Sequence, residues 1–73
     1  MSNETIRCIV NGKDENIPAD TSIKKYLDSL GVNPALVAVE INDNVVERKD
    51  FEKTIIQSND RVEYLFFMGG GDD

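Results

Sequence analysis

The sequence predicts an α+β domain in which one main helix packs on a mixed β-sheet of four to five strands. Three observations favour this fold class. One stretch of the 73-residue chain has helical periodicity, short apolar stretches of strand type lie on both sides of it, and turn-forming residues separate these elements. A helix covering one face of a sheet is a stable two-layer arrangement for a single domain of this length.

The first element expected along the chain is a hairpin. Residues 6–10 alternate in part, as a half-buried strand does, and the side chains on the apolar face are Ile6, Cys8 and Val10. Asn11 and Gly12 follow, and both tolerate the positive φ angles of a two-residue hairpin turn. Residues 15–17 are therefore the expected returning strand, which Pro18 ends.

Residues 23–30 form the one predicted helix. Apolar residues recur at the i, i+3, i+4 and i+7 spacing of a helix with one buried face, and they are Ile23, Tyr26, Leu27 and Leu30. Thr21 or Ser22 is placed to accept a hydrogen bond from a free N–H of the first turn. Gly31 stands where a left-handed C-terminal cap is expected. We expect the apolar face to pack on the first strand.

The second half of the chain predicts three more strands. Residues 37–41 and 45–46 read as a strand pair with an Asn-Asp-Asn turn, and residues 62–68 as a final strand rich in aromatic and branched residues. The connection before that strand has three apolar anchors, Phe51, Ile55 and Ile56. A hairpin, a crossover helix and a late strand match the β-grasp arrangement. The predicted domain spans residues 1–68, and residues 69–73 are a tail expected to be flexible.

Composition narrows the possible functions. Fourteen acidic and eight basic residues give a net charge of −6, which repels nucleic acid and anionic membranes and suits a partner with a basic face. The chain has no histidine, so histidine catalysis and ligation are excluded, and its single cysteine, Cys8, excludes an internal disulfide and is expected to be buried. No apolar run approaches the ~20 residues that span a bilayer. We expect a cytoplasmic protein, monomeric when free.

Three consecutive glycines follow the last predicted strand, and two aspartates follow the glycines. The glycines are Gly69, Gly70 and Gly71, and the aspartates are Asp72 and Asp73. Glycine has no Cβ, and three extended residues reach roughly 10 Å, which is enough to enter a narrow channel of another protein. A frayed chain end is the simpler alternative. A metal site on the tail aspartates is not expected, because a mobile pair of carboxylates makes a poor cage.

Four short segments carry a family resemblance. They are VNGK at residues 10–13, VAVEIN at 37–42, DRVE at 60–63 and GGG at 69–71. In order and spacing they resemble the ThiS family of sulfur carrier proteins, over nearly the whole chain. The resemblance implies a ubiquitin-like β-grasp fold and a carrier role in thiamine biosynthesis. Asp43 and Asn59 stand where that family often has glycine, and both residue types tolerate left-handed turns.

The resemblance also implies a mechanism in which the carrier is not an enzyme and binds no metal or cofactor. In that family an E1-like adenylating enzyme of the ThiF type uses ATP and magnesium to adenylate the terminal glycine. Sulfur then replaces AMP, and a thiazole synthase of the ThiG type takes the sulfur up. Gly71 matches the sulfur acceptor, and Gly69 and Gly70 match the tail that presents it. Family chains end at glycine, so a processing peptidase is expected to remove Asp72 and Asp73.

Residues 64–68 are five apolar residues in a row. Strict alternation sends Leu65 and Phe67 to one face of the strand and sends Tyr64, Phe66 and Met68 to the other. One helix cannot cover both faces of so small a sheet. We therefore expect Leu65 and Phe67 to form a patch that docks the adenylating enzyme, and the other set to face the core.

Three alternatives stay open at this point. A MoaD-type carrier for molybdopterin, or a related carrier for cysteine or another sulfur metabolite, keeps the same chemistry. MoaD proteins have prolines before their final glycines, where this chain has Met68. A ubiquitin-like modifier would instead form an isopeptide bond to a lysine. The third alternative is a small regulatory β-grasp domain with an incidental tail.

Overall fold

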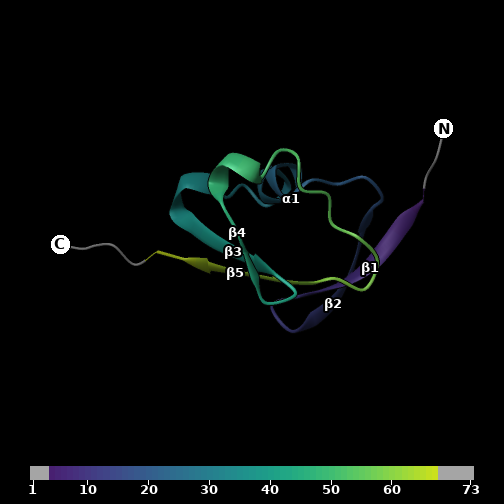
Figure 1. Cartoon of the computed structure of the whole chain (residues 1–73). Helices are drawn as coiled ribbons and strands as arrows, with labels where there is room; N and C mark the ends of the chain where they lie inside the picture. The colour runs from purple at the N-terminus through teal and green to yellow at the C-terminus, as the bar shows by residue number, and fades with distance from the viewer. Residues whose placement is uncertain (1–3, 68–73) are drawn as a thin grey trace.

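The computed structural model describes residues 4–67, which form one mixed sheet with one helix on it. Its elements are β1 (Thr5–Val10), β2 (Lys13–Pro18), α1 (Ile23–Ser29), the 3-10 turn η1 (Pro34–Leu36), β3 (Val37–Ile41), β4 (Asn44–Val46), the 3-10 turn η2 (Arg48–Asp50) and β5 (Arg61–Phe66). The strand order is β2-β1-β5-β3-β4. The helix lies on one face of the sheet (Figure 1), which confirms the α+β, β-grasp prediction.

The β1–β2 hairpin turns at Asn11 and Gly12, whose φ angles of 50° and 83° are the positive values that the sequence predicted. The returning strand is longer than predicted, because β2 begins at Lys13 directly after the turn. Its first residues are polar, and a strand at the edge of a sheet needs no apolar side chains to pair through its backbone. Apolar patterning therefore could not reveal that part of β2.

Helix α1 begins and ends with the predicted caps. The Ser22 hydroxyl oxygen accepts a hydrogen bond from the Lys25 N–H at 3.0 Å, and Gly31 adopts a φ of 72°. One prediction here is wrong, because Leu30 does not pack on the sheet and its side chain is 44% exposed. The helix has only seven residues, so the i+7 position falls on its C-terminal cap and not on its buried face.

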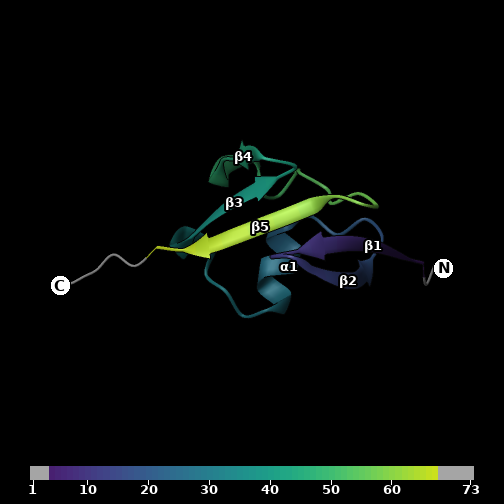
Figure 2. The same ribbon diagram turned by 90° about the horizontal axis from the view of Figure 1, so that it is seen from below.

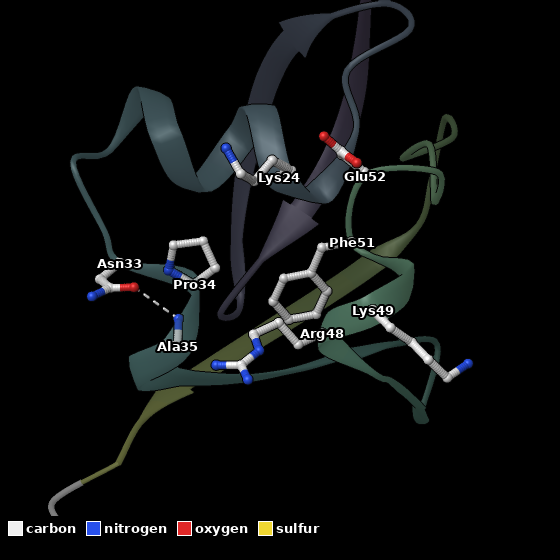
Figure 3. A pocket seen from close by; sticks show the side chains of 8 residues that line it. All are labelled: Lys24, Asn33, Pro34, Ala35, Arg48, Lys49, Phe51 and Glu52. Carbon is white, nitrogen blue, oxygen red and sulfur yellow. Dashed lines mark hydrogen bonds between the residues drawn. The ribbon is translucent and has the colours of Figure 1, made fainter.

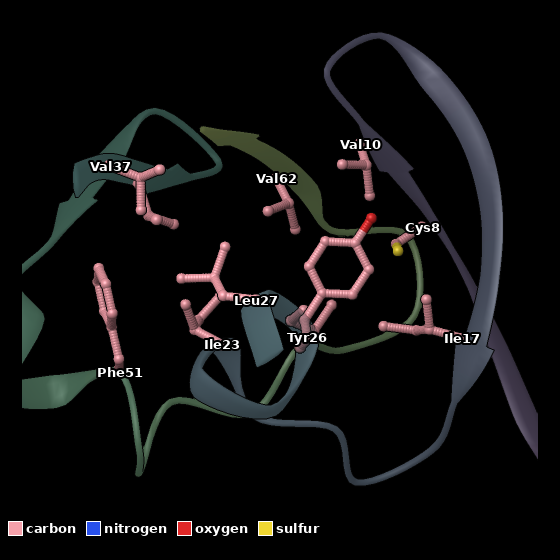
Figure 4. Close-up of a cluster of buried hydrophobic side chains, with 11 residues drawn as sticks. Cys8, Val10, Ile17, Ile23, Tyr26, Leu27, Val37, Phe51 and Val62 are labelled. Carbon is pink, nitrogen blue, oxygen red and sulfur yellow. The ribbon is translucent and has the colours of Figure 1, made fainter. Parts of the chain in front are cut away.

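The core lies between α1 and the sheet (Figure 4). Its buried members are Cys8, Val10, Ile17, Ile23, Tyr26, Leu27, Val37, Val39, Phe51, Ile56 and Val62. Two of the three predicted anchors are therefore buried, whereas Ile55 is only partly buried. The backbone of this connection also completes the helix, since the carbonyl oxygens of Phe51 and Thr54 accept hydrogen bonds from N–H groups at the start of α1.

Strand β5 lies in the middle of the sheet (Figure 2). Two asparagine side chains bond to its backbone. Oδ1 of Asn42 accepts a hydrogen bond from the Arg61 N–H at 2.9 Å, where the strand begins. Oδ1 of Asn11 accepts from the Tyr64 N–H at 2.9 Å, and the Asn11 N–H donates to the Val62 carbonyl oxygen at 2.9 Å. Asn11 therefore continues the pairing of β5 past the end of β1.

Three other turn residues fit the left-handed geometry expected of them. Asp43 and Asn59, the two positions at which the ThiS family often has glycine, each have a φ of 70°, and Asn42 has a φ of 52°. Asparagine and aspartate tolerate this region better than other residues with a side chain. Within residues 4–67, no helix reaches the length and apolar character that crossing a membrane requires.

The bond from Asn11 to β5 leads to a stability prediction. Asn11→Gly keeps a residue that tolerates a φ of 50° but removes the acceptor of the Tyr64 N–H. We expect the free energy of unfolding to fall by about 1 kcal/mol, the net worth of one such hydrogen bond. Urea unfolding measures this change, and hydrogen exchange at the Tyr64 amide should become faster.

Asn59→Gly is the matched control, because Asn59 also has a positive φ but makes no side-chain hydrogen bond within residues 4–67. We expect it to change stability by less than about 0.5 kcal/mol. Equal losses in the two variants would show that the Asn11 side chain does not stabilise β5.

Candidate functional site

The candidate site is the end of β5 and the glycine tail that follows it. The described residues stop at Phe67, so the predicted acceptor Gly71, its neighbours Gly69 and Gly70, and the aspartates after them lie outside the described part. The predicted boundary at residue 68 lies outside it as well. The structure therefore bears on how the domain holds the strand that leads to the tail.

Strand β5 is paired with β3 along almost its whole length, up to the edge of the domain. Five register pairs join the two strands, from Ile41↔Val62 to Val37↔Phe66, whereas only two pairs join β5 to β1. The strand is also shorter than the predicted 62–68, since it begins at Arg61 and ends at Phe66. Pairing continues one residue further, because the Phe67 N–H donates to the Leu36 carbonyl oxygen at 2.9 Å.

The apolar side chains at the end of β5 lie largely in solvent. Leu65 and Phe67, the residues predicted to dock a partner, are 73% and 61% exposed.

The expectation that Phe66 faces the core is wrong, because its side chain is 50% exposed. Val62 and Tyr64 lie on the same side of the strand and are buried and partly buried, so the core ends beneath Tyr64. Phe66 packs edge-on against the Tyr64 ring, with centroids 6.0 Å apart.

The sheet face that α1 leaves uncovered carries a shallow hollow with a volume of about 500 Å³. It is lined by Asn11, Ala38, Glu40, Glu63, Tyr64 and Leu65. Carboxylate oxygens of Glu40, Asp43 and Glu63 lie within 4.8 Å of one another. Arg61 pairs with Asp43 at 2.9 Å. Exposed acids of this kind do not by themselves define a metal centre, but they make this face negatively charged.

A second hollow lies on the helix side of the sheet, beside α1 (Figure 3). Its volume is about 450 Å³, and its lining residues are Lys24, Asn33, Pro34, Ala35, Arg48, Lys49, Phe51 and Glu52. Lys24 is paired with Asp28 at 2.9 Å, and Lys49 lies near Glu47 and Asp50. This hollow contains neither a cysteine nor a histidine, so it offers no thiol or imidazole for sulfur chemistry.

The remaining candidate for sulfur chemistry is Cys8, which is buried in the core. Burial and the negative charges of Glu15 and Asp60 raise the pKa of its thiol, so the thiolate that would act as a nucleophile is disfavoured. Burial and the hydrogen bond that the Tyr26 hydroxyl donates to Glu15 at 2.8 Å also raise the pKa of Tyr26. Both groups therefore stay neutral at physiological pH and serve packing.

Sequence reasoning overlooked the two asparagines that hold β5. Asn11 and Asn42 were interpreted only as turn formers, and each also bonds a backbone N–H of β5. The available signal was the choice of asparagine over glycine at a left-handed position. Glycine also fits this backbone region, and an asparagine there has a side-chain amide that can bond, as at Asn11 and Asn42. Asn59 shows that a positive φ does not require such a bond, since its side chain makes none within residues 4–67.

Comparisons with known proteins agree with this geometry. The model of the ThiS family matches residues 3–71. The crystal structure of the thiamine biosynthesis protein ThiS from Geobacter metallireducens superimposes with a TM-score of 0.78 at 36% identity, covering 90% of this chain and all of that one. The ycf40 protein of Porphyra purpurea is 32% identical over 71 residues, which is 97% of this chain and all of that protein.

Two longer relatives are thiazole synthases. That of Paramagnetospirillum magneticum is 31% identical over 68 residues, and that of Magnetococcus marinus is 39% identical over 62 residues. These matches cover 93% and 85% of this chain but only 21% and 19% of the two enzymes, so the chain spans about a fifth of their length. Since the family model covers almost all of the sequence, the chain belongs to the ThiS family.

Proposed function

We propose that this chain is a sulfur carrier of thiamine biosynthesis, which carries sulfur as a thiocarboxylate on Gly71. The observation that carries the proposal is the family match, which runs through the glycine tail and stops at residue 71. The shape of the domain supports it. Strand β5 is bonded on both edges where it begins and leads out of the sheet toward the glycines.

The proposed chemistry needs no reactive group from the domain. The carboxylate oxygen of Gly71 attacks the α-phosphorus of ATP, and pyrophosphate leaves. Hydrosulfide (HS⁻) from the sulfur donor then attacks the carbonyl carbon of the acyl adenylate, and AMP leaves with the electron pair of the broken C–O bond. The product is a thiocarboxylate. The neutral Cys8 and Tyr26 of the core agree with a carrier that only presents its terminus.

Two partners follow from this chemistry. The first is an adenylating enzyme of the ThiF type, which holds the ATP and magnesium, and the second is a thiazole synthase of the ThiG type. The likeness to two thiazole synthases supports the second partner, because each of those enzymes contains a segment similar to this carrier. The same likeness favours the thiamine pathway over molybdopterin or cysteine synthesis.

The proposed docking patch for the adenylating enzyme consists of Leu65 and Phe67. Both side chains are mostly exposed and both lie directly before the tail. A contact there would hold the domain while the glycines enter the active site. Exposed apolar side chains at such a place are typical of surfaces that a partner covers.

We also propose that Asp72 and Asp73 are removed before sulfur transfer. An active site that accepts consecutive glycines is shaped for a backbone without side chains. The two aspartates would bring Cβ atoms and negative charge beside the ATP phosphates, where like charges repel. A peptidase that cleaves after Gly71 would expose the carboxylate that is to be activated.

The test of the proposed function compares three chains, which end at Asp73, Gly71 and Gly70. Each is incubated with the cognate adenylating enzyme, ATP, magnesium and a sulfur donor. We expect only the chain that ends at Gly71 to gain about 16 Da, the mass difference between sulfur and oxygen. The chain ending at Gly70 is the control for tail length. Equal modification of the full chain, on Asp73, would contradict both the processing step and the acceptor assignment.

A separate prediction concerns docking. Leu65→Ser should weaken binding to the adenylating enzyme by at least about 1 kcal/mol, which is about fivefold, because an apolar contact would be lost. Val45→Ser is the matched control, since Val45 is 71% exposed on β4 and is not part of the proposed patch. Calorimetric titration measures both. Equal weakening by the two variants, or none by Leu65→Ser, would contradict the patch.

A further inference from the structure

Strand β5 has a free edge where it runs past β1. The pairing of β5 with β1 stops at Val10↔Val62, and Asn11 adds two more bonds, to the Val62 carbonyl oxygen and to the Tyr64 N–H. In Figure 2 the end of β5 extends well beyond the end of β1. On its other side β5 stays paired with β3 as far as Phe67.

The register shows which backbone groups point to this free edge. The Asn42 N–H donates to the Arg61 carbonyl oxygen, and the Phe67 N–H donates to the Leu36 carbonyl oxygen. Hydrogen-bonded pairs alternate along an antiparallel ladder, so residues 61, 63, 65 and 67 bond to β3 or to the residues that flank it. Residues 62, 64 and 66 therefore present their N–H and C=O groups to the opposite edge.

Three of these groups have no protein partner within residues 4–67. The Val62 carbonyl oxygen and the Tyr64 N–H both bond to Asn11. The next groups along the edge are the Tyr64 C=O and the N–H and C=O of Phe66, for which the described residues provide no hydrogen bond. A row of unpaired donors and acceptors is a template for another strand.

This edge lacks the features that keep other edges of the same sheet from pairing. The outer edge strand β2 has the sequence KDENIP, with three charged residues and a proline. The other outer strand, β4, has only three residues. Charge, proline and short length are the usual protection of an exposed edge. The free part of β5 instead reads Tyr-Leu-Phe-Phe from residue 64, with no charge and three largely exposed apolar side chains.

We propose that the free edge of β5 at residues 64–66 pairs with an extended segment of the adenylating enzyme, which adds one strand to the sheet. The inference rests on the proposed function, which supplies the partner. Strand addition uses main-chain hydrogen bonds for affinity and alternate side chains for specificity. It would also fix the direction of the strand that leads directly to the glycine tail.

The charges on the open face define the side chain that this segment presents. Glu40 and Glu63 lie directly opposite each other across the β3–β5 pair, and like charges in that position are unfavourable. Within residues 4–67, no lysine or arginine forms an ion pair with either of them. The partner segment therefore presents a lysine or arginine to the hollow beside them and an apolar side chain to Leu65.

A second copy of this chain fits the edge poorly. Each copy has a net charge of −6, so two copies repel each other. Pairing of two β5 edges would also bring a second set of open-face carboxylates near the first. Charge therefore favours a partner with a basic residue in the added strand.

The test replaces a single backbone N–H by an ester oxygen in the full 73-residue chain, made by chemical synthesis. An ester at Phe66 removes its outward donor, keeps the side chain, and weakens the Leu65 carbonyl oxygen as an acceptor in the β3 ladder. The cognate adenylating enzyme is the binding partner. Its affinity is measured by calorimetric titration, and amide hydrogen exchange is followed in the unmodified chain.

The matched control is an ester at Asn16 on the outer edge of β2. Asn16 pairs with Arg7, whose carbonyl oxygen accepts from the Asn59 N–H and so faces away from β2. The Asn16 N–H therefore also points out of the sheet. This ester likewise removes one outward donor and weakens one ladder acceptor, the Glu15 carbonyl oxygen.

We expect the ester at Phe66 to weaken binding about three- to tenfold, the effect of one lost hydrogen bond, and the ester at Asn16 to change it less than about twofold. Hydrogen exchange of the Phe66 amide should slow in the complex.

Unchanged affinity of both esters, together with weakened binding of Leu65→Ser, would overturn the inference and leave the proposed function standing. Protection of the Phe66 amide by self-association of the chain alone would also overturn it. Absence of binding both by the unmodified chain and by the chain that ends at Gly71 would reject the proposed function, and the inference with it.

Discussion

The pairing of β5 is the constraint on which the rest of the structure depends. This strand is hydrogen-bonded to β1 and to β3 where it begins, and it brings the last part of the chain into the middle of the sheet. Buried backbone groups must be paired, and Asn11 and Asn42 supply bonds to β5 where neighbouring strands stop. The first residues of β5 are hydrogen-bonded on both edges, whereas its last residues are less covered by the domain. Strand β5 therefore gives the chain a fixed point from which a tail can be presented.

The two sides of the sheet differ in cover and in the side chains that they present. The open face has Glu40 and Glu63 beside exposed Leu65, and the hollow on the helix side has Lys24, Arg48 and Lys49. This difference gives two partners different places to bind. A carrier that meets an adenylating enzyme and then a sulfur acceptor would use such a difference to distinguish the two encounters.

Features set by local chemistry could be predicted from the sequence. The Asn11-Gly12 turn, the Ser22 cap and the left-handed Gly31 follow from residue type and spacing within a few positions. Periodicity also assigned the buried side chains of α1 correctly, except for Leu30. Hydrophobic periodicity shows which side of a helix or strand is apolar. It does not show where the element that packs against that side ends. Phe66 was assigned to the core for the same reason.

Long-range pairings could not be predicted in the same way. The parallel contact of β1 with β5 joins residues about fifty positions apart, and so does the bond from Asn11 to Tyr64. The β5 edge at residues 64–66 appears only when the unequal lengths of its two neighbours are known. The site on the tail came instead from the family resemblance, since glycines carry no pattern of burial that would distinguish an acceptor from a chain end.

The most direct test of sulfur carriage is the intact mass of this protein isolated from its native cells during thiamine synthesis. We expect a chain that ends at Gly71, with a fraction that is about 16 Da heavier because sulfur has replaced one oxygen of the terminal carboxylate. Treatment with an alkylating reagent should shift only that heavier fraction, since Cys8 is buried in the folded domain. A chain that retains Asp72 and Asp73 throughout, with no sulfur-bearing form, would contradict the account.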